Sequence, residues 1–320
     1  MSPRTRVSLV VAAAAIAAAG VTVAATSLMS TDLPDQPGLA PRDGVPPLVL
    51  DLGVRTDPQA RALRRAVGLH RRGRLQEARR IFARYGSVEA EVGEALSDWP
   101  QGVERLRELA RDRPRSGAAQ LALGLAAFWE GDLEAARAAW ARAKAAEPDT
   151  QYAIRAADLL HPELPVPGLP TFVPSFPSPG ALGRLSPPRQ LAFLRRRARG
   201  GDAQDHLLYG AALQRLGRPL SARREFATAH ALVPEDPDAL TASAVGLFDK
   251  DRPADAFSRL GPLARRFPKA ATVRFHLGLL LVWMGRVEDA RRQFRLAREV
   301  EPGSIPARQA AAFLRRLPAA

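Results

Sequence analysis

The residue types best suited to catalysis or metal binding are few in this chain and stand apart. The chain has no cysteine, and its histidines are isolated from one another at spacings that no metal site uses: His70, His161, His206, His230 and His276. It has no phosphate-binding glycine loop, no serine nucleophile elbow and no paired-histidine motif of the zinc proteases. We therefore expect a protein that is not an enzyme and that holds no cofactor or metal ion.

Positive charge is the other chemical feature, because the formal net charge is +14 and almost every basic residue is arginine. Seven arginines recur at fixed spacing: Arg79, Arg80, Arg137, Arg223, Arg224, Arg291 and Arg292. Such a basic surface attracts phosphate, anionic lipid or an acidic polymer, and the alternative is an ordinary solvated charged face. Aromatic residues are not interleaved with these arginines, so the pattern does not predict nucleic-acid binding.

The elements that carry these residues follow a 34-residue period. Four segments begin at Gly117, Ala203, Pro237 and Ala271, and the last three are contiguous. The eighth place is small (Gly124, Gly210, Ala244, Gly278), the twentieth is alanine (Ala136, Ala222, Ala256, Ala290), the twenty-fourth is large and apolar (Trp140, Phe226, Leu260, Phe294), and the thirty-second is proline (Pro148, Pro234, Pro268, Pro302). Small residues let two helices approach closely, and glycine near the fifteenth place with proline at the thirty-second ends each helix. The period predicts helix pairs that must stack on their neighbours.

This pattern resembles the tetratricopeptide repeat family. The resemblance implies an all-α, right-handed solenoid of antiparallel helix pairs, which we expect to be preceded by one transmembrane helix. We expect N-terminal repeats over 59–161, including two atypical units at 59–86 and 87–116, and C-terminal repeats over 189–320. The latter comprise repeats 203–236, 237–270 and 271–304 and a capping helix, and the repeat at 237–270 is degenerate because Asp251 replaces the turn glycine.

The amino terminus carries an uncharged stretch over residues 7–29, long enough as a helix to cross a membrane. Because Arg4 and Arg6 precede it, we expect 1–30 to be a signal anchor with a cytoplasmic N-terminus and extracytoplasmic repeats in a bacterial cell envelope. Removal of this segment as a cleaved signal peptide, giving a secreted protein, is the alternative.

Two proline-rich stretches connect these parts. Residues 31–58 are expected to form a spacer, whose Leu48, Val49, Leu50 and Leu52 could dock on the first repeat. Residues 162–188 form an insertion that either links two arms or loops out of one solenoid. Its Phe172 and Phe176 either offer a partner a polyproline ligand or cover the repeats themselves.

The family resemblance also implies a concave groove, lined by the first helices, that binds a peptide or helix of another protein. At the groove places of the family this sequence has mostly apolar side chains: Leu121, Leu125, Phe128, Trp129, Val245, Phe248, Phe275, Leu279, Val282 and Trp283. We expect a non-catalytic scaffold that is tethered to the membrane and binds an unidentified envelope protein in this groove. The alternative is a module that binds an anionic polymer or membrane surface through the arginines.

Overall fold

A computed structural model describes residues 42–317, which form fifteen α-helices, one short 3-10 helix and, within that range, no strand. The predicted membrane span over residues 7–29 lies outside the described residues. Within 42–317, no helix is both long enough and apolar enough to cross a membrane. The described chain divides into two compact units, which we call the N-terminal unit (residues 42–162) and the C-terminal unit (residues 163–317).

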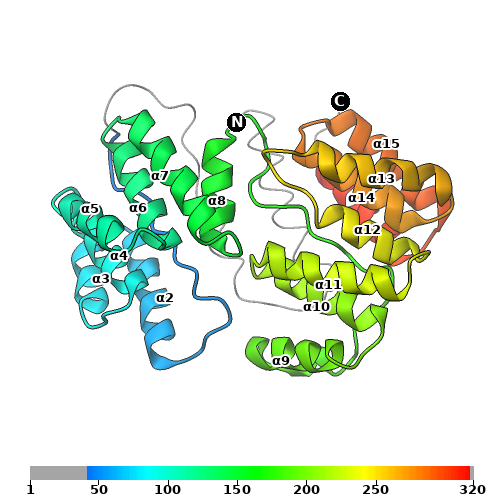
Figure 1. The fold of residues 1–320 in the computed structure, drawn as a ribbon, viewed down its shortest axis with the longest axis horizontal. Helices are drawn as coiled ribbons and strands as arrows, with labels where there is room; N and C mark the ends of the chain where they lie inside the picture. Colours follow the sequence, from blue (N-terminus) through cyan, green and yellow to red (C-terminus); the bar gives the residue numbers. More distant parts are fainter. Residues whose placement is uncertain (1–41, 318–320) are drawn as a thin grey trace. The chain divides into compact units, whose positions relative to one another are not determined.

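The N-terminal unit consists of three antiparallel helix pairs and one closing helix (Figure 1). The pairs are α2 (Pro58–Arg71) with α3 (Leu75–Phe82), α4 (Val88–Ser97) with α5 (Val103–Asp112), and α6 (Gly117–Trp129) with α7 (Leu133–Ala146), and α8 (Gln151–Leu160) closes the unit against α6 and α7. The first helices touch in the order α2, α4, α6, α8, so they form the inner layer of the array.

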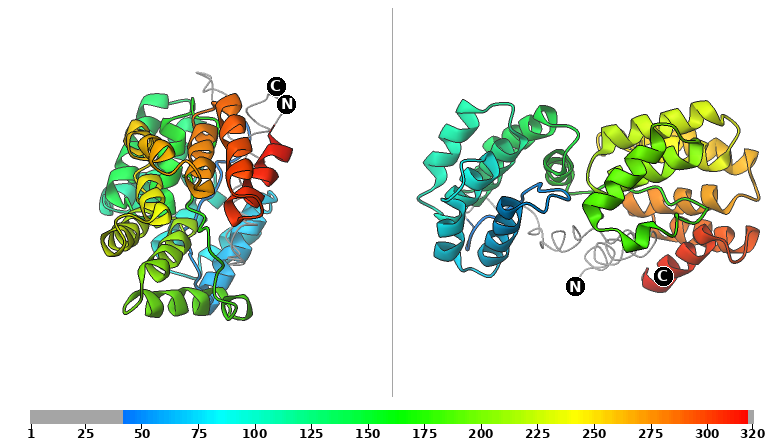
Figure 2. Two further views of the ribbon diagram at one scale, coloured as in Figure 1. Left: turned by 90° about the vertical axis from the view of Figure 1, so that its right-hand side faces the viewer. Right: turned by 90° about the horizontal axis from the view of Figure 1, so that it is seen from below.

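The C-terminal unit has the same plan, with one additional helix before its first pair in the sequence (Figure 2). After the 3-10 helix η2 (Leu182–Arg184) come α9 (Pro187–Ala198), the pairs α10 (Ala203–Arg215) with α11 (Pro219–Leu232), α12 (Pro237–Val245) with α13 (Ala254–Arg266), and α14 (Ala271–Trp283) with α15 (Val287–Val300), and the closing helix α16 (Ile305–Arg316). Here α10, α12, α14 and α16 touch in sequence and form the inner layer.

The close approach of the two helices in a pair depends on the small residues of the repeat pattern. Gly278 shows this in α14, since a Cβ atom built there would lie 2.7 Å from Cε1 of Phe294 in α15. Ala290 and Phe294 are both fully buried, as are their counterparts Ala222 and Phe226. The predicted register of these places is therefore confirmed.

The helix ends also fall where the pattern predicts. Gly131, Gly217 and Gly285 have positive φ angles of 87°, 69° and 71°, which an L-residue adopts only at a cost. Each second helix of the four regular segments ends two residues before its proline, as α15 does at Val300 before Pro302. The degenerate repeat has the short first helix α12, which ends at Val245.

Candidate peptide-binding groove

Each unit has an extended stretch of its own chain packed on its inner layer. We call residues 42–52 segment N and residues 165–176 segment C; neither contains helix or strand. Segment N precedes the helices of the N-terminal unit in the sequence. Segment C precedes those of the C-terminal unit and is part of the extended green chain that passes α12 and α10 in Figure 1. The two stretches come from the regions expected to be a spacer and an insertion.

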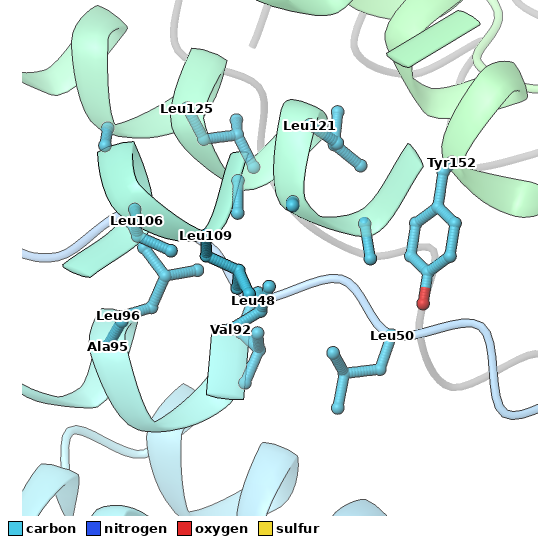
Figure 3. Close-up of a cluster of buried hydrophobic side chains, with 14 of the residues drawn as sticks. Leu48, Leu50, Val92, Ala95, Leu96, Leu106, Leu109, Leu121, Leu125 and Tyr152 are labelled. Atoms are coloured by element: carbon cyan, nitrogen blue, oxygen red, sulfur yellow. The ribbon is translucent and has the colours of Figure 1, made fainter. Parts of the chain in front are cut away.

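Segment N is held mainly by leucine side chains. Leu48, Leu50 and Leu52 are buried and belong to the apolar core of the N-terminal unit, together with residues of α4, α5, α6 and α8. Figure 3 shows Leu48 beside Val92 and Leu109. These leucines dock on the repeats as the sequence predicted, although the surface that receives them extends beyond the first repeat.

The polar contacts of segment N lie at its two ends. The backbone N–H of Arg42 donates to the carbonyl of Trp129 (2.8 Å), and the Arg42 guanidinium lies 4.2 Å from the ring centroid of Phe128. At the other end the N–H of Asp51 donates to the Tyr152 hydroxyl (2.9 Å), while the N–H of Gln151 donates to the Asp51 carboxylate (3.2 Å). Near the same end, Nη2 of Arg64 in α2 donates to the carbonyl of Leu52 (3.4 Å), so Tyr152 and Arg64 are array side chains that bond to the backbone of segment N.

Segment C begins against the carboxyl-terminal ends of the first helices. Nζ of Lys250, which follows α12, donates to the carbonyl of Val166 (2.9 Å), and Nε1 of Trp283 in α14 donates to the carbonyl of Gly168 (3.0 Å). Both donors are buried. Two carbonyl oxygens of an extended chain are therefore recognised by side chains that the repeats hold in place.

Phe172 anchors the middle of segment C. Its side chain is fully buried, stacks on the His276 ring (centroids 5.1 Å apart, 19° between planes) and meets Phe226 edge to face (5.6 Å). Its backbone N–H donates to Oε1 of Gln214 in α10 (2.7 Å). Aromatic contacts of this kind contribute about 0.5–1.5 kcal/mol beyond the burial of apolar area.

His276 reads the next residue of segment C. Its Nδ1 lies 2.7 Å from the carbonyl oxygen of Thr272, and its Nε2 accepts the backbone N–H of Val173 (2.9 Å). Since a carbonyl can only accept and an N–H can only donate, the ring must be the neutral tautomer with its proton on Nδ1. Burial lowers the pKa of His276 to about 4, with the Thr272 hydrogen bond acting in the opposite direction.

The last polar contact is made by Asp238 near the start of α12. Its Oδ2 accepts both the backbone N–H of Ser175 (2.9 Å) and the Ser175 hydroxyl (2.6 Å). Burial raises the pKa of the Asp238 carboxyl, and the two hydrogen bonds from Ser175 partly offset this. Because Oδ2 of this buried carboxylate accepts from both a hydroxyl and an N–H, the site selects a small hydroxyl residue at this point.

Each segment crosses the inner layer of its own unit from the carboxyl-terminal ends of the first helices toward their amino-terminal ends. Segment N passes from the end of α6, at Trp129, to the start of α8, at Tyr152. Segment C passes from the ends of α12 and α14, at Lys250 and Trp283, to the start of α12, at Asp238. Each segment is thus antiparallel to the first helices on which it lies.

The residues predicted to line the groove are mostly buried. Trp129 is partly exposed, and the other nine are buried: Leu121, Leu125, Phe128, Val245, Phe248, Phe275, Leu279, Val282 and Trp283. Leu121 and Leu125 share a core with the leucines of segment N, and Phe275, Leu279, Val282 and Trp283 share one with Val166 and Val173 of segment C. A partner-binding role for these residues stays a prediction.

The arginines predicted to form a basic surface have different surroundings. Arg79 pairs with Asp98 (2.6 Å) and Arg292 with Asp289 (2.8 Å), while Nη1 of Arg291 lies 3.4 Å from the carbonyl of Leu317. The remaining members are exposed: Arg80, Arg137, Arg223 and Arg224. Within the described residues, no group of three or more histidine, aspartate or glutamate side chains is placed to hold a metal ion.

The polar side chains that form hydrogen bonds with segment C were not predicted from the sequence. Gln214, Asp238, Lys250 and His276 each lie on or just after a first helix, among apolar residues that the pattern assigns to the inner layer. What marks them in the sequence is a polar residue type at a repeat position that faces the inner layer. A buried polar group without a hydrogen-bonding partner is costly at such a position. That signal indicates a hydrogen-bonding partner without naming it.

Comparisons with known proteins agree with this architecture. The tetratricopeptide repeat family model matches residues 89–150 and 241–305, which cover corresponding parts of the two units, so the chain contains tetratricopeptide repeats. No curated protein sequence matches the chain.

Similar solved structures include the crystal structure of yeast Tom70 and that of the APC/C hetero-tetramer Cut9-Hcn1. The first has a TM-score of 0.34 and 14% identity, covering 86% of this chain and 52% of that chain. The second has a TM-score of 0.27 and 16% identity, covering 81% of this chain and 56% of that chain. The present chain thus spans about half the length of either matched chain.

Proposed function

We propose that this protein is a non-catalytic scaffold that holds an extended peptide of a partner protein on the inner layer of its C-terminal repeats. The observation that carries the proposal is that this surface already binds an extended chain through Gln214, Lys250, His276 and Trp283. All four side chains bond to backbone atoms of that chain. Recognition of a backbone in this way gives affinity for an extended peptide, while pockets such as the Phe172 site give selectivity.

The repeat class supports the same function, because tetratricopeptide arrays typically serve protein–protein interaction. Their first helices present a continuous surface built from several repeats, so one bound peptide contacts residues far apart in the sequence. Asp238 and His276 illustrate this, since they belong to different repeats and bind Ser175 and Val173, two residues apart.

The membrane tether is a further part of the proposal. It rests on the uncharged stretch over residues 7–29 with Arg4 and Arg6 before it. In this arrangement the repeats lie outside the cytoplasm and the partner is an envelope protein. Protease added to intact cells should degrade the repeats while the chain sediments with membranes. Complete protection of the repeats in intact cells would contradict this topology.

Site-specific crosslinking in native membranes tests the binding surface. A photoreactive residue replaces Gln214, on the inner layer, and in a matched control replaces Arg224, which is exposed on α11. We expect adducts larger than the chain itself from position 214 and none from position 224, with yields that change little with salt. Adducts from position 224 alone, lost as salt is added, would instead favour binding of an anionic surface through the arginines.

A further inference from the structure

We propose that segment C is an internal copy of the partner's binding motif, which keeps the inner layer occupied until a partner peptide of the same pattern replaces it. This inference rests on the proposed function and specifies the chemistry of the partner.

The positions of the prolines match the hydrogen bonds that the repeats make. The repeats accept backbone N–H groups from Phe172, Val173 and Ser175, and none of these is proline. The prolines of segment C stand at the other places: Pro165, Pro167, Pro170 and Pro174. Proline removes an N–H donor and favours an extended backbone. Four residues of segment C are therefore prolines that stiffen its extended backbone, and none of them removes an N–H that the repeats accept.

The binding surface specifies the side chains of an occupant as well. The pocket between Phe226 and His276 takes an aromatic ring, as Phe172 shows. Asp238 takes a hydroxyl residue three places later, as Ser175 shows. Four places before the aromatic residue stands Gly168, whose φ of 74° favours glycine and whose carbonyl binds Trp283. The partner motif is thus an extended, proline-containing peptide with glycine, then an aromatic residue, an apolar residue and a serine or threonine at these spacings.

The ends of segment C allow it to leave without unwinding a helix. Pro162 and Glu163 before it, and Pro177, Gly180, Ala181 and Gly183 after it, are exposed. A segment tethered at both ends competes with a free peptide at an effective concentration of about millimolar. A partner peptide must therefore outcompete the tethered segment. It displaces segment C only when its own local concentration is high or its sequence fits the binding surface better.

Segment N has a different mode of attachment, which is why the inference concerns segment C alone. Its leucines belong to the main core of the N-terminal unit, and the array side chains of Tyr152 and Arg64 bond to its backbone only at its last two residues, Asp51 and Leu52. These contacts do not recognise the backbone of segment N at successive points along the segment.

The test uses the full chain and a fluorescent peptide with the sequence of residues 163–178, measured by fluorescence anisotropy. In the released variant, Phe172→Ala and Ser175→Ala weaken the internal copy while the binding surface stays intact. We expect the released variant to bind the peptide at least tenfold more tightly than the natural sequence does. A peptide with the same two replacements should not bind, and adding Gln214→Ala to the released variant should weaken binding again.

A second form of the chain covers the case in which the released variant loses its fold. Protease sites are placed at 162–163 and at 180–181, before η2, so that cutting frees both ends of segment C without changing its contacts. We expect the cut segment to exchange with the labelled peptide. A folded released variant that does not bind the peptide, or a cut segment that does not exchange, would overturn the inference. Crosslinks from position 214 to a partner would still stand in that case, so failure of this inference is distinguishable from failure of the proposed function.

Discussion

The two units share one plan and differ in how they hold the segment on their inner layer. In each, three helix pairs and a closing helix receive an extended stretch that lies before them in the sequence and runs antiparallel to the first helices. Segment N contributes three leucines to the core, whereas the backbone of segment C bonds to five array side chains, those of Gln214, Asp238, Lys250, His276 and Trp283. One array shape thus holds an extended stretch in two ways. Apolar burial makes a stretch part of the core, and backbone recognition makes it resemble a bound peptide.

Removing the leucines of segment N should have the largest effect. Leu48→Ala and Leu50→Ala each delete a buried side chain, and such changes usually cost about 2–5 kcal/mol. We expect the double variant to lose the cooperative unfolding of the N-terminal unit in a urea titration followed by circular dichroism. The matched control is Leu232→Ala, because Leu232 is 53% exposed. Unchanged unfolding of the double variant would remove the distinction between the two segments.

Phe172→Ala should also destabilise, by about 3 kcal/mol, because a fully buried ring is lost between Phe226 and His276. Unlike the leucine changes, it should leave the helices of the C-terminal unit folded. Hydrogen exchange should show this as faster exchange at Val173 and Ser175 with slow exchange retained in α14. Global loss of protection in the C-terminal unit would mean that segment C is as much a part of the core as segment N.

Acid should loosen the C-terminal unit through His276. The folded pKa of His276 lies near 4 and its ordinary value is 6.5, so between these values the unfolded chain binds a proton that the folded chain excludes. The stabilisation is therefore present above pH 6.5 and is lost as the pH falls to about 4, an effect of about 3 kcal/mol at 1.36 kcal/mol per pKa unit.

Two other buried groups respond to pH in the same experiment. Asp238 acts in the opposite sense, because its raised pKa lets the folded chain take up a proton first. His70, buried in the N-terminal unit with a lowered pKa, acts in the same sense as His276. Comparison with His276→Gln, in thermal unfolding between pH 7 and pH 4, isolates the contribution of His276. An identical pH dependence in both proteins would contradict it.

The smallest effect is expected from the exposed arginines. Arg223→Gln and Arg224→Gln alter side chains on α11 that are open to solvent, so stability should change by less than about 0.5 kcal/mol. Capture of the partner at physiological salt should also be unaffected. A marked loss of partner capture would indicate that the partner binds the exposed arginines of α11 and not the inner layer that holds segment C.

Much of the array follows from local sequence, because its rules act over a few residues. Gly278 and Ala290 are small since Phe294 must fit between two helices, and Pro302 lies two residues beyond the end of α15, so the period could be read from residue types alone. The docking of Leu48 and Leu50 was also foreseeable from their apolar character within a proline-rich stretch. Nine of the ten predicted groove residues lie on α6, α12 and α14 and Phe248 follows α12, yet the sequence did not show that this layer would be covered.

What only the tertiary structure decided is the partner of each polar residue on that layer. Gln214, Asp238 and His276 are spread over 63 residues of sequence, and they meet at segment C because stacking brings three first helices side by side. The sequence by itself determined the helix pairs, their turns and their order, since packing within a repeat is local. Contacts between residues as distant as Val173 and His276 form only when segment C lies across several stacked repeats, and no short-range pattern encodes that placement.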